Sequence, residues 1–308
     1  MRDTAALAGP APATRASRGI GEAAAAWVLC APAGLALFAL LLGPSAALLV
    51  LSFSDWELGA PELAWIGLGN YVELTTDPVF RIALRNTLIY VGVVMPASIG
   101  LGLGVALLVE GGSRLRATFR AIYFLPVVSL LVAMATAWQY LLHPTIGPVN
   151  RVLALLGISP INWLGSSDWV MVSLCMIGVW ENLGFVVVLF MAGLTAIPRE
   201  LYAAAELDGA RSAMDRFRLV TWPLLGPTTL FVVTITAIRC LRVFDTVQAL
   251  TRGGPNNASQ VLLYAMYQEG FSYFRIGYSA AITVVFLAIV LLLMLVQTRI
   301  LDRRVHYS

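Results

Sequence analysis

The stretch Ile197–Pro227, IPRELYAAAELDGARSAMDRFRLVTWPLLGP, is the most polar long stretch in the second half of the chain, and long apolar segments flank it on both sides. Pro198 can open a helix and the alanines after it favour one. Asp208-Gly209 is expected to end that helix, because glycine tolerates a left-handed backbone. A second helical piece follows, which Pro223 is expected to stop. We therefore expect a helix–turn–helix that forms a docking surface between two membrane spans.

The composition excludes a soluble domain. Of 308 residues, 59% are hydrophobic and 12% are charged, which is typical of an all-α, polytopic membrane protein. All 20 basic residues are arginine, so the Gly-Lys-Ser/Thr element of a phosphate-binding P-loop is absent from the sequence. The chain is therefore not expected to be an ATPase or another enzyme. Its three cysteines lie in apolar runs without paired spacing, which predicts free thiols and no metal site.

Hydropathy predicts six transmembrane helices. The chain is expected to consist of a flexible tail, residues 1–26, a membrane domain that contains the six helices, residues 27–300, and a C-terminal tail, residues 301–308. In the second span, Gly100 and Gly104 form a small-xxx-small pair that is expected to permit close helix approach. The six spans are placed at about 27–53, 87–109, 122–142, 169–194, 224–249 and 276–296.

The arginines predict the orientation of these spans. With six helices, 13 arginines fall on the side of the two termini and of the polar stretch, 5 fall on the other side, and 2 lie within a span. Because loops rich in basic residues stay in the cytoplasm, both termini and residues 197–223 are predicted to be cytoplasmic.

The polar stretch resembles the EAA loop of the permease subunits of binding-protein-dependent ABC importers. That loop has the approximate pattern E-A-A, three residues, Gly, about nine residues, then I-x-L-P. Here Ala203 stands in place of the Glu, Trp222 in place of the Leu, and the spacing from Gly to Pro is one residue longer. The matching residues that the resemblance assigns to ATPase coupling are Ala203, Ala204, Ala205, Asp208, Gly209 and Pro223.

Further motifs resemble the sugar-type permeases of the maltose and glycerol-3-phosphate group, over nearly the whole chain. They are Gly67-Leu68-Gly69-Asn70-Tyr71 followed by Asp77, Phe80 and Asn86-Thr87; Gly147 with Asn150 and Trp163-Leu164; and F-D-x-V-x-x-L-T-x-G-G-P at 244–255.

The resemblance implies the transmembrane domain of a type I ABC importer in a bacterial cytoplasmic membrane. It also implies three partners: a second, homologous permease, a dimer of ATP-binding subunits and an extracytoplasmic solute-binding protein. No cofactor is expected on this chain, because ATP and Mg²⁺ belong to the partner ATPase. The solute stays open among oligosaccharides, amino sugars, and glycerol phosphate or its diesters.

Charged residues inside spans require an explanation, because each costs about 2.5–3.5 kcal/mol at membrane depth on insertion scales. Arg242 and Asp245 are three residues apart and are expected on one helical face, where they can pair. Two interpretations stand: a polar lining for a hydroxyl-rich solute, or an ion-pair network between helices. The candidate pathway residues are Glu181, Asn182, Arg239, Arg242, Asp245 and Gln248.

Two other classes of membrane protein are alternatives to the permease subunit. An ion-coupled secondary transporter would be favoured by inverted repeats and broken helices at the membrane midplane, which the sequence does not show clearly. An intramembrane enzyme would be favoured by HExxH, GxSxG or paired aspartates, which the spans lack. The permease subunit is the preferred interpretation.

Overall fold

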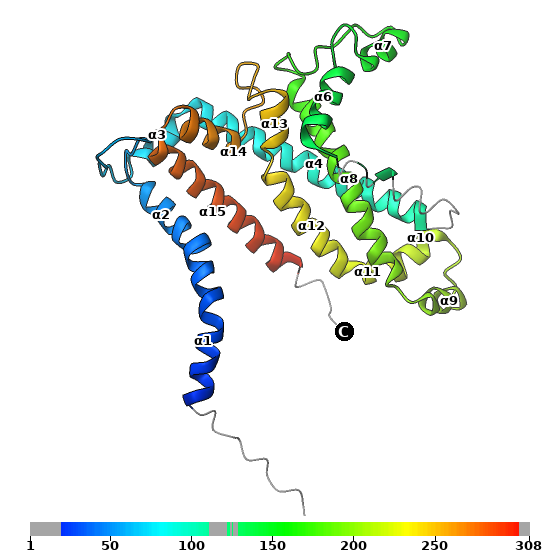
Figure 1. Cartoon of the computed structure of the whole chain (residues 1–308). Coiled ribbons are helices and arrows are strands. Elements are labelled where there is room, and N and C mark those ends of the chain that lie inside the picture. Colours follow the sequence, from blue (N-terminus) through cyan, green and yellow to red (C-terminus); the bar gives the residue numbers. More distant parts are fainter. Residues whose placement is uncertain (1–19, 111–121, 124, 126–128, 302–308) are drawn as a thin grey trace, which may run out of the picture. The chain divides into compact units, whose positions relative to one another are not determined.

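The computed structural model describes residues 20–110, 122, 123, 125 and 129–301, and Figure 1 shows their helices. The chain forms two units, Met1–Leu48 and Leu49–Ser308. The first unit holds α1 (Ile20–Leu37), the π-helical turn η1 (Phe38–Leu42) and the first part of α2 (Gly43–Leu51), whose last three residues belong to the second unit. Residues 20–26, assigned to the N-terminal tail from the sequence, are therefore helical, and residues 1–19 and 302–308 lie outside the description.

The second unit contains α-helices and two π-helical turns, and its described residues hold only isolated β-bridges. In chain order the elements are α3 (Gly69–Thr76), α4 (Pro78–Glu110), α6 (Leu131–Leu141), α7 (Pro148–Leu155), α8 (Val170–Thr195), α9 (Arg199–Leu207), α10 (Ala213–Arg216), η2 (Phe217–Thr221), α11 (Trp222–Leu224), α12 (Gly226–Leu241), α13 (Asp245–Leu250), α14 (Leu262–Tyr267), η3 (Gln268–Ser272) and α15 (Ile276–Leu301).

Within the described residues, four helical stretches are long and apolar enough to span a membrane: Ala24–Leu51, α4, α8 and Ile276–Gln297 within α15. A fifth is present if the pair Ala213–Leu224 and Gly226–Leu250, bent by 69°, is one span. Of the predicted span at 122–142, the described part holds the 11-residue α6, and residues 124 and 126–128 lie outside the description. The all-α membrane architecture is confirmed, and the count of six stays a prediction.

The predicted span at 224–249 is not one continuous helix. α12 ends at Leu241 and α13 begins at Asp245, so Arg242–Phe244 form a break. The break has a packing reason, since Val243 turns into the core and the ring of Phe244 packs against Tyr264 and Tyr267, at 6.2 and 5.3 Å between ring centroids. No proline or glycine marks this position, so local sequence gave no warning of it.

α4 and α8 pack closely through glycines that the sequence did not single out. A Cβ at Gly102 would overlap Val186, and a Cβ at Gly178 would overlap the hydroxyl of Tyr90. The expectation for Gly100 and Gly104 was wrong within this chain, because no described atom lies within 4 Å of a Cβ built at either. Gly100 and Gly104 therefore lie on a side of α4 that faces away from α8, whereas close approach needs the small residue on the contacting side.

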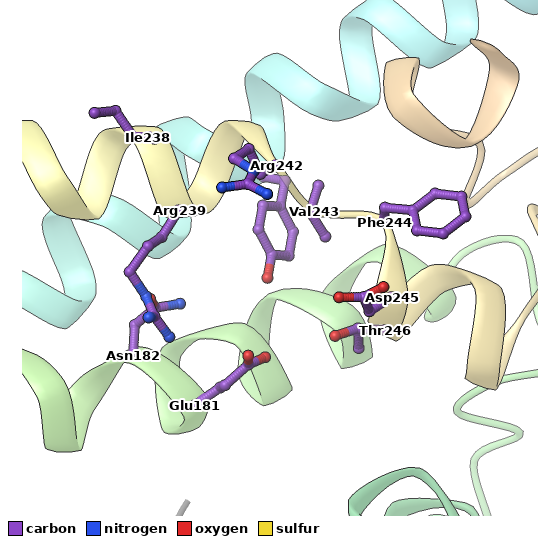
Figure 2. Close-up of a pocket in the computed structure, with 10 residues that line it drawn as sticks. Glu181, Asn182, Ile238, Arg239, Arg242, Val243, Phe244, Asp245 and Thr246 are labelled. Carbon is purple, nitrogen blue, oxygen red and sulfur yellow. The ribbon is translucent and has the colours of Figure 1, made fainter. Parts of the chain in front are cut away.

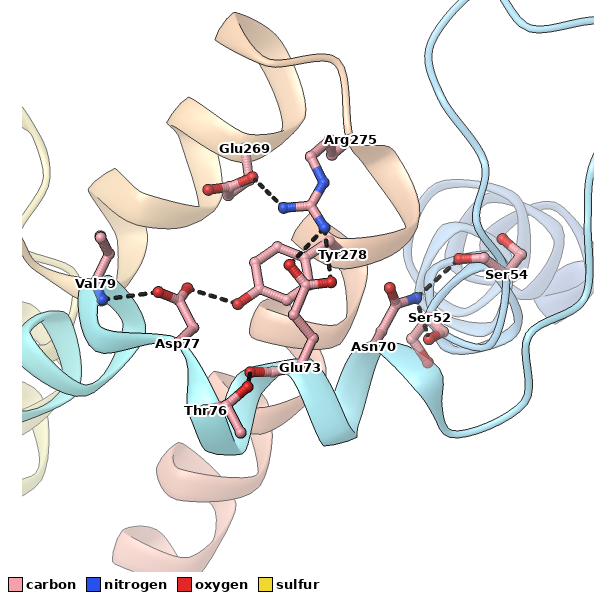
Figure 3. A network of polar contacts seen from close by, with 10 residues as sticks. All are labelled: Ser52, Ser54, Asn70, Glu73, Thr76, Asp77, Val79, Glu269, Arg275 and Tyr278. Carbon is pink, nitrogen blue, oxygen red and sulfur yellow. Dashed lines mark hydrogen bonds and ion pairs between the residues drawn. The ribbon is translucent and has the colours of Figure 1, made fainter.

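A polar clasp ties α3, η3 and α15 together at the start of α4 (Figure 3); it consists of Glu73, Asp77, Glu269, Arg275 and Tyr278. Arg275 donates to both carboxylate oxygens of Glu73, at 2.7 and 2.8 Å, and to Glu269 at 3.4 Å. Asp77 accepts the hydroxyl of Tyr278 at 2.6 Å with one oxygen and caps α4 with the other. Burial raises the pKa of Glu269, against the opposing pull of Arg275.

Asparagines from the family motifs hold the neighbouring loops. Asn70 donates to the carbonyls of Ser52 and Ser54, at 2.9 and 2.8 Å. Asn86 donates to the carbonyls of Ala258 and Gln260, at 3.0 and 2.9 Å. These amides satisfy backbone groups that no helix pairs, so the motif residues here fix the fold of the loops.

The two parts of the motif that contains Gly147, Asn150 and Trp163-Leu164 also meet in space. The amide of Asn150 donates to the carbonyl of Ile161 at 2.8 Å, and its oxygen accepts the indole N–H of Trp163 at 3.1 Å. Asn150 is 4% exposed, so removing its amide would leave several partly buried partners unsatisfied.

Candidate functional site

A polar pocket of about 230 Å³ lies where α8 faces the break between α12 and α13 (Figure 2). α8 contributes an acid and an amide, the end of α12 two arginines, and the start of α13 a second acid. Five of the six predicted pathway residues are thus brought together. The polar pocket is lined by Tyr90, Glu181, Asn182, Ile238, Arg239, Arg242, Val243, Phe244, Asp245 and Thr246.

Arg239 is held in place by neutral groups. Its Nε donates to Oδ1 of Asn182 at 3.0 Å, and its guanidinium lies 4.9 Å from the ring centroid of Phe185. Asn182 donates in turn to the carbonyl of Gly178, one turn earlier on α8, at 2.8 Å. These contacts orient the arginine without neutralising its charge, so the guanidinium stays a charged donor beside the pocket.

The other charges also stay without a salt bridge. Among the described residues, Glu181, Arg242 and Asp245 join no ion pair. The expected pairing of Arg242 with Asp245 on one helical face was wrong, because the helix breaks between them and the i, i+3 geometry is lost. Both side chains are exposed. The described structure therefore favours a polar lining over a direct lock between these two residues.

Gln248 is not among the lining residues. It lies on α13, one turn beyond the pocket, and its side-chain oxygen is buried without a hydrogen-bond partner in the described residues. Sequence reasoning missed Tyr90 and Thr246, which line the pocket. Tyr90 comes from α4, far away in sequence, and gave no signal. Thr246 follows Asp245 within the family motif at 244–255, and that adjacency was a usable signal.

The first half of the loop 197–223 folds as predicted. α9 follows Pro198, and Gly209 has φ of +100°, in the left-handed region. The N–H of Ala210 donates to the carbonyl of Ala205 at 2.9 Å, and that of Gly209 to Glu206 at 3.2 Å, which together form a Schellman motif. A β-carbon at Gly209 would meet no described atom within 4 Å, so backbone conformation alone demands glycine there.

The second half of the loop is joined to the first. Ser212 and Asp215 form a reciprocal capping box at the start of α10. Arg216 pairs with Glu206 of α9, and the hydroxyls of Tyr202 and Thr221 lie 3.1 Å apart. These contacts make the helix–turn–helix one mechanical unit. We call residues 197–223 the coupling loop, after the role in ATPase coupling that the family resemblance implies for them.

Pro223 does not stop the helix as expected. It lies within α11, at a first-turn position where the missing N–H is tolerated. The bend follows at Leu225, before α12 begins at Gly226.

One face of the coupling loop is apolar and exposed. Leu207 is 90% exposed and Met214 is 56% exposed. Ala203 and Ala204 are exposed on α9, whereas Ala205 packs against the core. These apolar side chains are therefore accessible to a partner in the described structure.

Residues 98–307 match the family described as the binding-protein-dependent transport system inner membrane component. This covers more than half of the sequence. The chain belongs to this family.

Relatives agree over most of their length. A probable ABC transporter permease protein of Bacillus subtilis, YurN, is 34% identical over 81% of this chain and 86% of that protein. The sulfoquinovosyl glycerol transport system permease protein SmoG of Agrobacterium fabrum is 31% identical over 92% of each chain. The trehalose/maltose transport system permease protein MalF of Thermococcus litoralis is 34% identical over 70% of this chain and 72% of that protein.

A solved structure shares the fold. A chain of the bacterial alginate ABC transporter, crystallised with its alginate pentasaccharide-bound periplasmic protein, superposes with a TM-score of 0.81. The match covers 93% of this chain and 98% of that chain at 22% identity. The transmembrane domain of an ABC importer is therefore the fold of this chain.

Proposed function

We propose that this chain is the permease subunit of an ABC importer, and that it forms half of the pathway for a sugar or sugar-like solute. The family match over residues 98–307 is the observation that carries the transport role. It does not favour the ion-coupled secondary transporter. The names of SmoG and MalF support a carbohydrate. Glycerol phosphate is the second candidate, because the sn-glycerol-3-phosphate permease protein UgpA of Agrobacterium fabrum is 30% identical.

The polar pocket supports contact between this subunit and the solute. Glu181 and Asp245 offer acceptors, and Arg239 and Arg242 offer donors. Hydroxyl groups both donate and accept, so a hydroxyl-rich solute can bind both kinds of group at once. Charge-assisted hydrogen bonds are about twice as strong as neutral ones, which suits a site that replaces water around a sugar.

The coupling loop is proposed to dock onto a separate ATPase. Its apolar exposed face needs a partner, and its internal contacts let a push on α9 reach the core through Tyr202 and Thr221. ATP and Mg²⁺ would be held by that partner, because this sequence has no lysine for a P-loop. A second, homologous permease and an extracytoplasmic solute-binding protein complete the proposed assembly.

A transport assay tests the function. The complex, reconstituted in proteoliposomes with its binding protein, is offered labelled trehalose, maltose and sn-glycerol-3-phosphate, with ATP inside. Uptake that needs both ATP and the binding protein is expected for one of these solutes. Uptake driven by an ion gradient without ATP would instead establish a secondary transporter. Nucleotide hydrolysis by the purified chain alone would also contradict the proposal.

The coupling role has its own test. Ala204→Trp places a bulky ring on the exposed face of α9 and should lower uptake and co-purification of the ATPase at least about tenfold, which is 1.4 kcal/mol of docking energy. The matched control is Ala154→Trp on α7, another exposed helical alanine. Normal uptake by the Ala204 variant at normal membrane abundance would leave the coupling loop without this role.

Gly209 provides an independent variant. Gly209→Val forces a β-branched residue into a left-handed backbone at a cost of about 1–3 kcal/mol, and should uncouple transport. Gly209→Asn should retain more uptake than Gly209→Val, because asparagine tolerates a left-handed backbone better than a β-branched residue does. Equal uptake by both variants would show that the Gly209 turn is unimportant for coupling.

The orientation of the membrane domain is testable by labelling. In a background with Cys30 replaced by Ser, Ser167→Cys should react with an impermeant thiol reagent from outside, whereas Arg211→Cys should react only after the membrane is opened. Both positions are exposed. Labelling of the Arg211 variant from outside would reverse the proposed topology.

A further inference from the structure

Two arginines lie on one exposed stripe at the beginning of α4. Arg81 and Arg85 are four residues apart and, with Pro78 and Ile82, line a hollow of about 280 Å³. Both side chains are exposed. This hollow is separate from the polar pocket and shares no lining residue with it.

These two charges are not neutralised within the described residues. Neither arginine joins an ion pair there, and Arg81 donates only to the carbonyl of Thr76, at 3.3 Å. The nearby acids are already engaged, since Asp77 caps α4 and accepts from Tyr278, and Glu73 binds Arg275.

The location makes the two charges costly. A helix carries about half a positive charge at its N-terminus, which disfavours the cation Arg81 in the first turns of α4. Like charges at i, i+4 repel each other by a few tenths of a kcal/mol. A bound anion would relieve both effects at once.

The same stripe becomes apolar further along the helix. Leu88, Ile89 and Val93 follow at helical spacing and are 53, 42 and 47% exposed. α4 has 33 residues and is thus about 50 Å long, longer than the hydrocarbon core of about 30 Å. The first turns of α4 can therefore reach the level of lipid headgroups while the apolar part of the stripe lies beside the acyl chains.

We infer that Arg81 and Arg85 bind the phosphate of an anionic phospholipid, whose acyl chains lie along Leu88, Ile89 and Val93. Arginine suits this ligand because its planar donors match phosphate oxygens. Two guanidinium groups favour a headgroup with net negative charge, such as phosphatidylglycerol, over zwitterionic phosphatidylcholine. The apolar stripe selects a lipid over a free phosphate or an acidic protein segment.

Native mass spectrometry of the detergent-purified complex tests the site. Dioleoyl phosphatidylglycerol should bind saturably and more tightly than dioleoyl phosphatidylcholine. Arg81→Gln and Arg85→Gln should each weaken binding about fivefold, since one basic residue near an anionic surface contributes about 1 kcal/mol. Arg81→Lys/Arg85→Lys keeps both charges and should retain most binding. Arg151→Gln, an exposed arginine on α7, is the matched control and should bind normally.

The remaining outcomes overturn the inference. Equal affinity for the two lipids would contradict the proposed lipid site. Unchanged affinity of phosphatidylglycerol for the double variant Arg81→Gln/Arg85→Gln would contradict it as well. Complete displacement of phosphatidylglycerol by millimolar inorganic phosphate would show that the two arginines form a site for a free anion and not for a lipid. Loss of a protein subunit from the double Gln variant, with unchanged lipid binding, would assign the two arginines to a protein partner.

Discussion

The polar clasp and the polar pocket are built from the same residue types, but the clasp groups bind one another and the pocket groups face a cavity. In the clasp, Arg275 is matched by Glu73 and Glu269, and Asp77 by Tyr278. In the pocket, Glu181 and Asp245 face two arginines without a salt bridge in the described residues. Groups that satisfy each other stabilise a fold, whereas groups left facing a cavity remain available to a ligand.

This difference implies opposite consequences for substitution. Removing one partner of a matched set strands the others, so clasp variants should lose stability. Neutralising an unmatched charge removes a desolvation cost, so pocket variants should keep or gain stability while transport falls.

The largest expected effect is in the pocket. Glu181→Gln should lower uptake of the transported solute at least about tenfold, because a hydrogen bond to a charged group contributes about 1.5–3 kcal/mol. The melting temperature of the purified complex should stay equal or rise. Uptake and melting temperature are measured on the same preparations. Normal uptake with a lower melting temperature would make Glu181 a structural residue, like the residues of the clasp.

The next effect is in the clasp. Arg275→Met should destabilise the protein by about 1 kcal/mol, a modest value because the arginine side chain is 36% exposed and Glu73 is 45% exposed. Uptake per folded molecule should be unchanged. Arg151→Met, an arginine that joins no ion pair in the described part of the chain, is the control and should melt normally. A loss of uptake without a loss of stability would place the clasp in the transport step.

Much of the fold was predictable because its signals are local. The lengths of the apolar segments predicted α4, α8 and α15, and the position of Gly209 after an alanine-rich helix predicted its turn. The break at Arg242–Phe244 was not predictable, since packing against Tyr264 and Tyr267 holds it there. The contacts of Gly102 and Gly178 depend likewise on which face of α4 meets α8.

Some features of the candidate site were likewise predictable from the sequence, and others required the structure. The cost of charge inside a membrane identified Glu181, Arg239 and Asp245 from the sequence. Their lack of salt bridges depends on the helix break and required the structure. Motif resemblance pointed to Asn86 and Asn150 without distinguishing function from architecture, and their hydrogen bonds identify them as supports of loops.

The pH dependence of stability should show the weakest effect, which comes from Glu269 within the clasp. Burial raises the pKa of Glu269 above the reference value of 4.5, so the folded protein holds this proton more tightly than the unfolded chain does. Its contribution to stability is therefore complete below about pH 4.5 and is lost as pH rises through the raised pKa. Because Arg275 opposes the effect of burial, the change is small.

Glu269→Gln stays neutral at every pH and isolates this contribution. Its melting temperature should fall less than that of the wild type as pH rises from about 4.5 to 7, although losing the contact with Arg275 lowers the whole curve. Glu206→Gln, on the exposed ion pair of the coupling loop, is the control and should not change the slope in this way. Parallel curves for wild type and Glu269→Gln would mean that Arg275 fully offsets the effect of burial on Glu269.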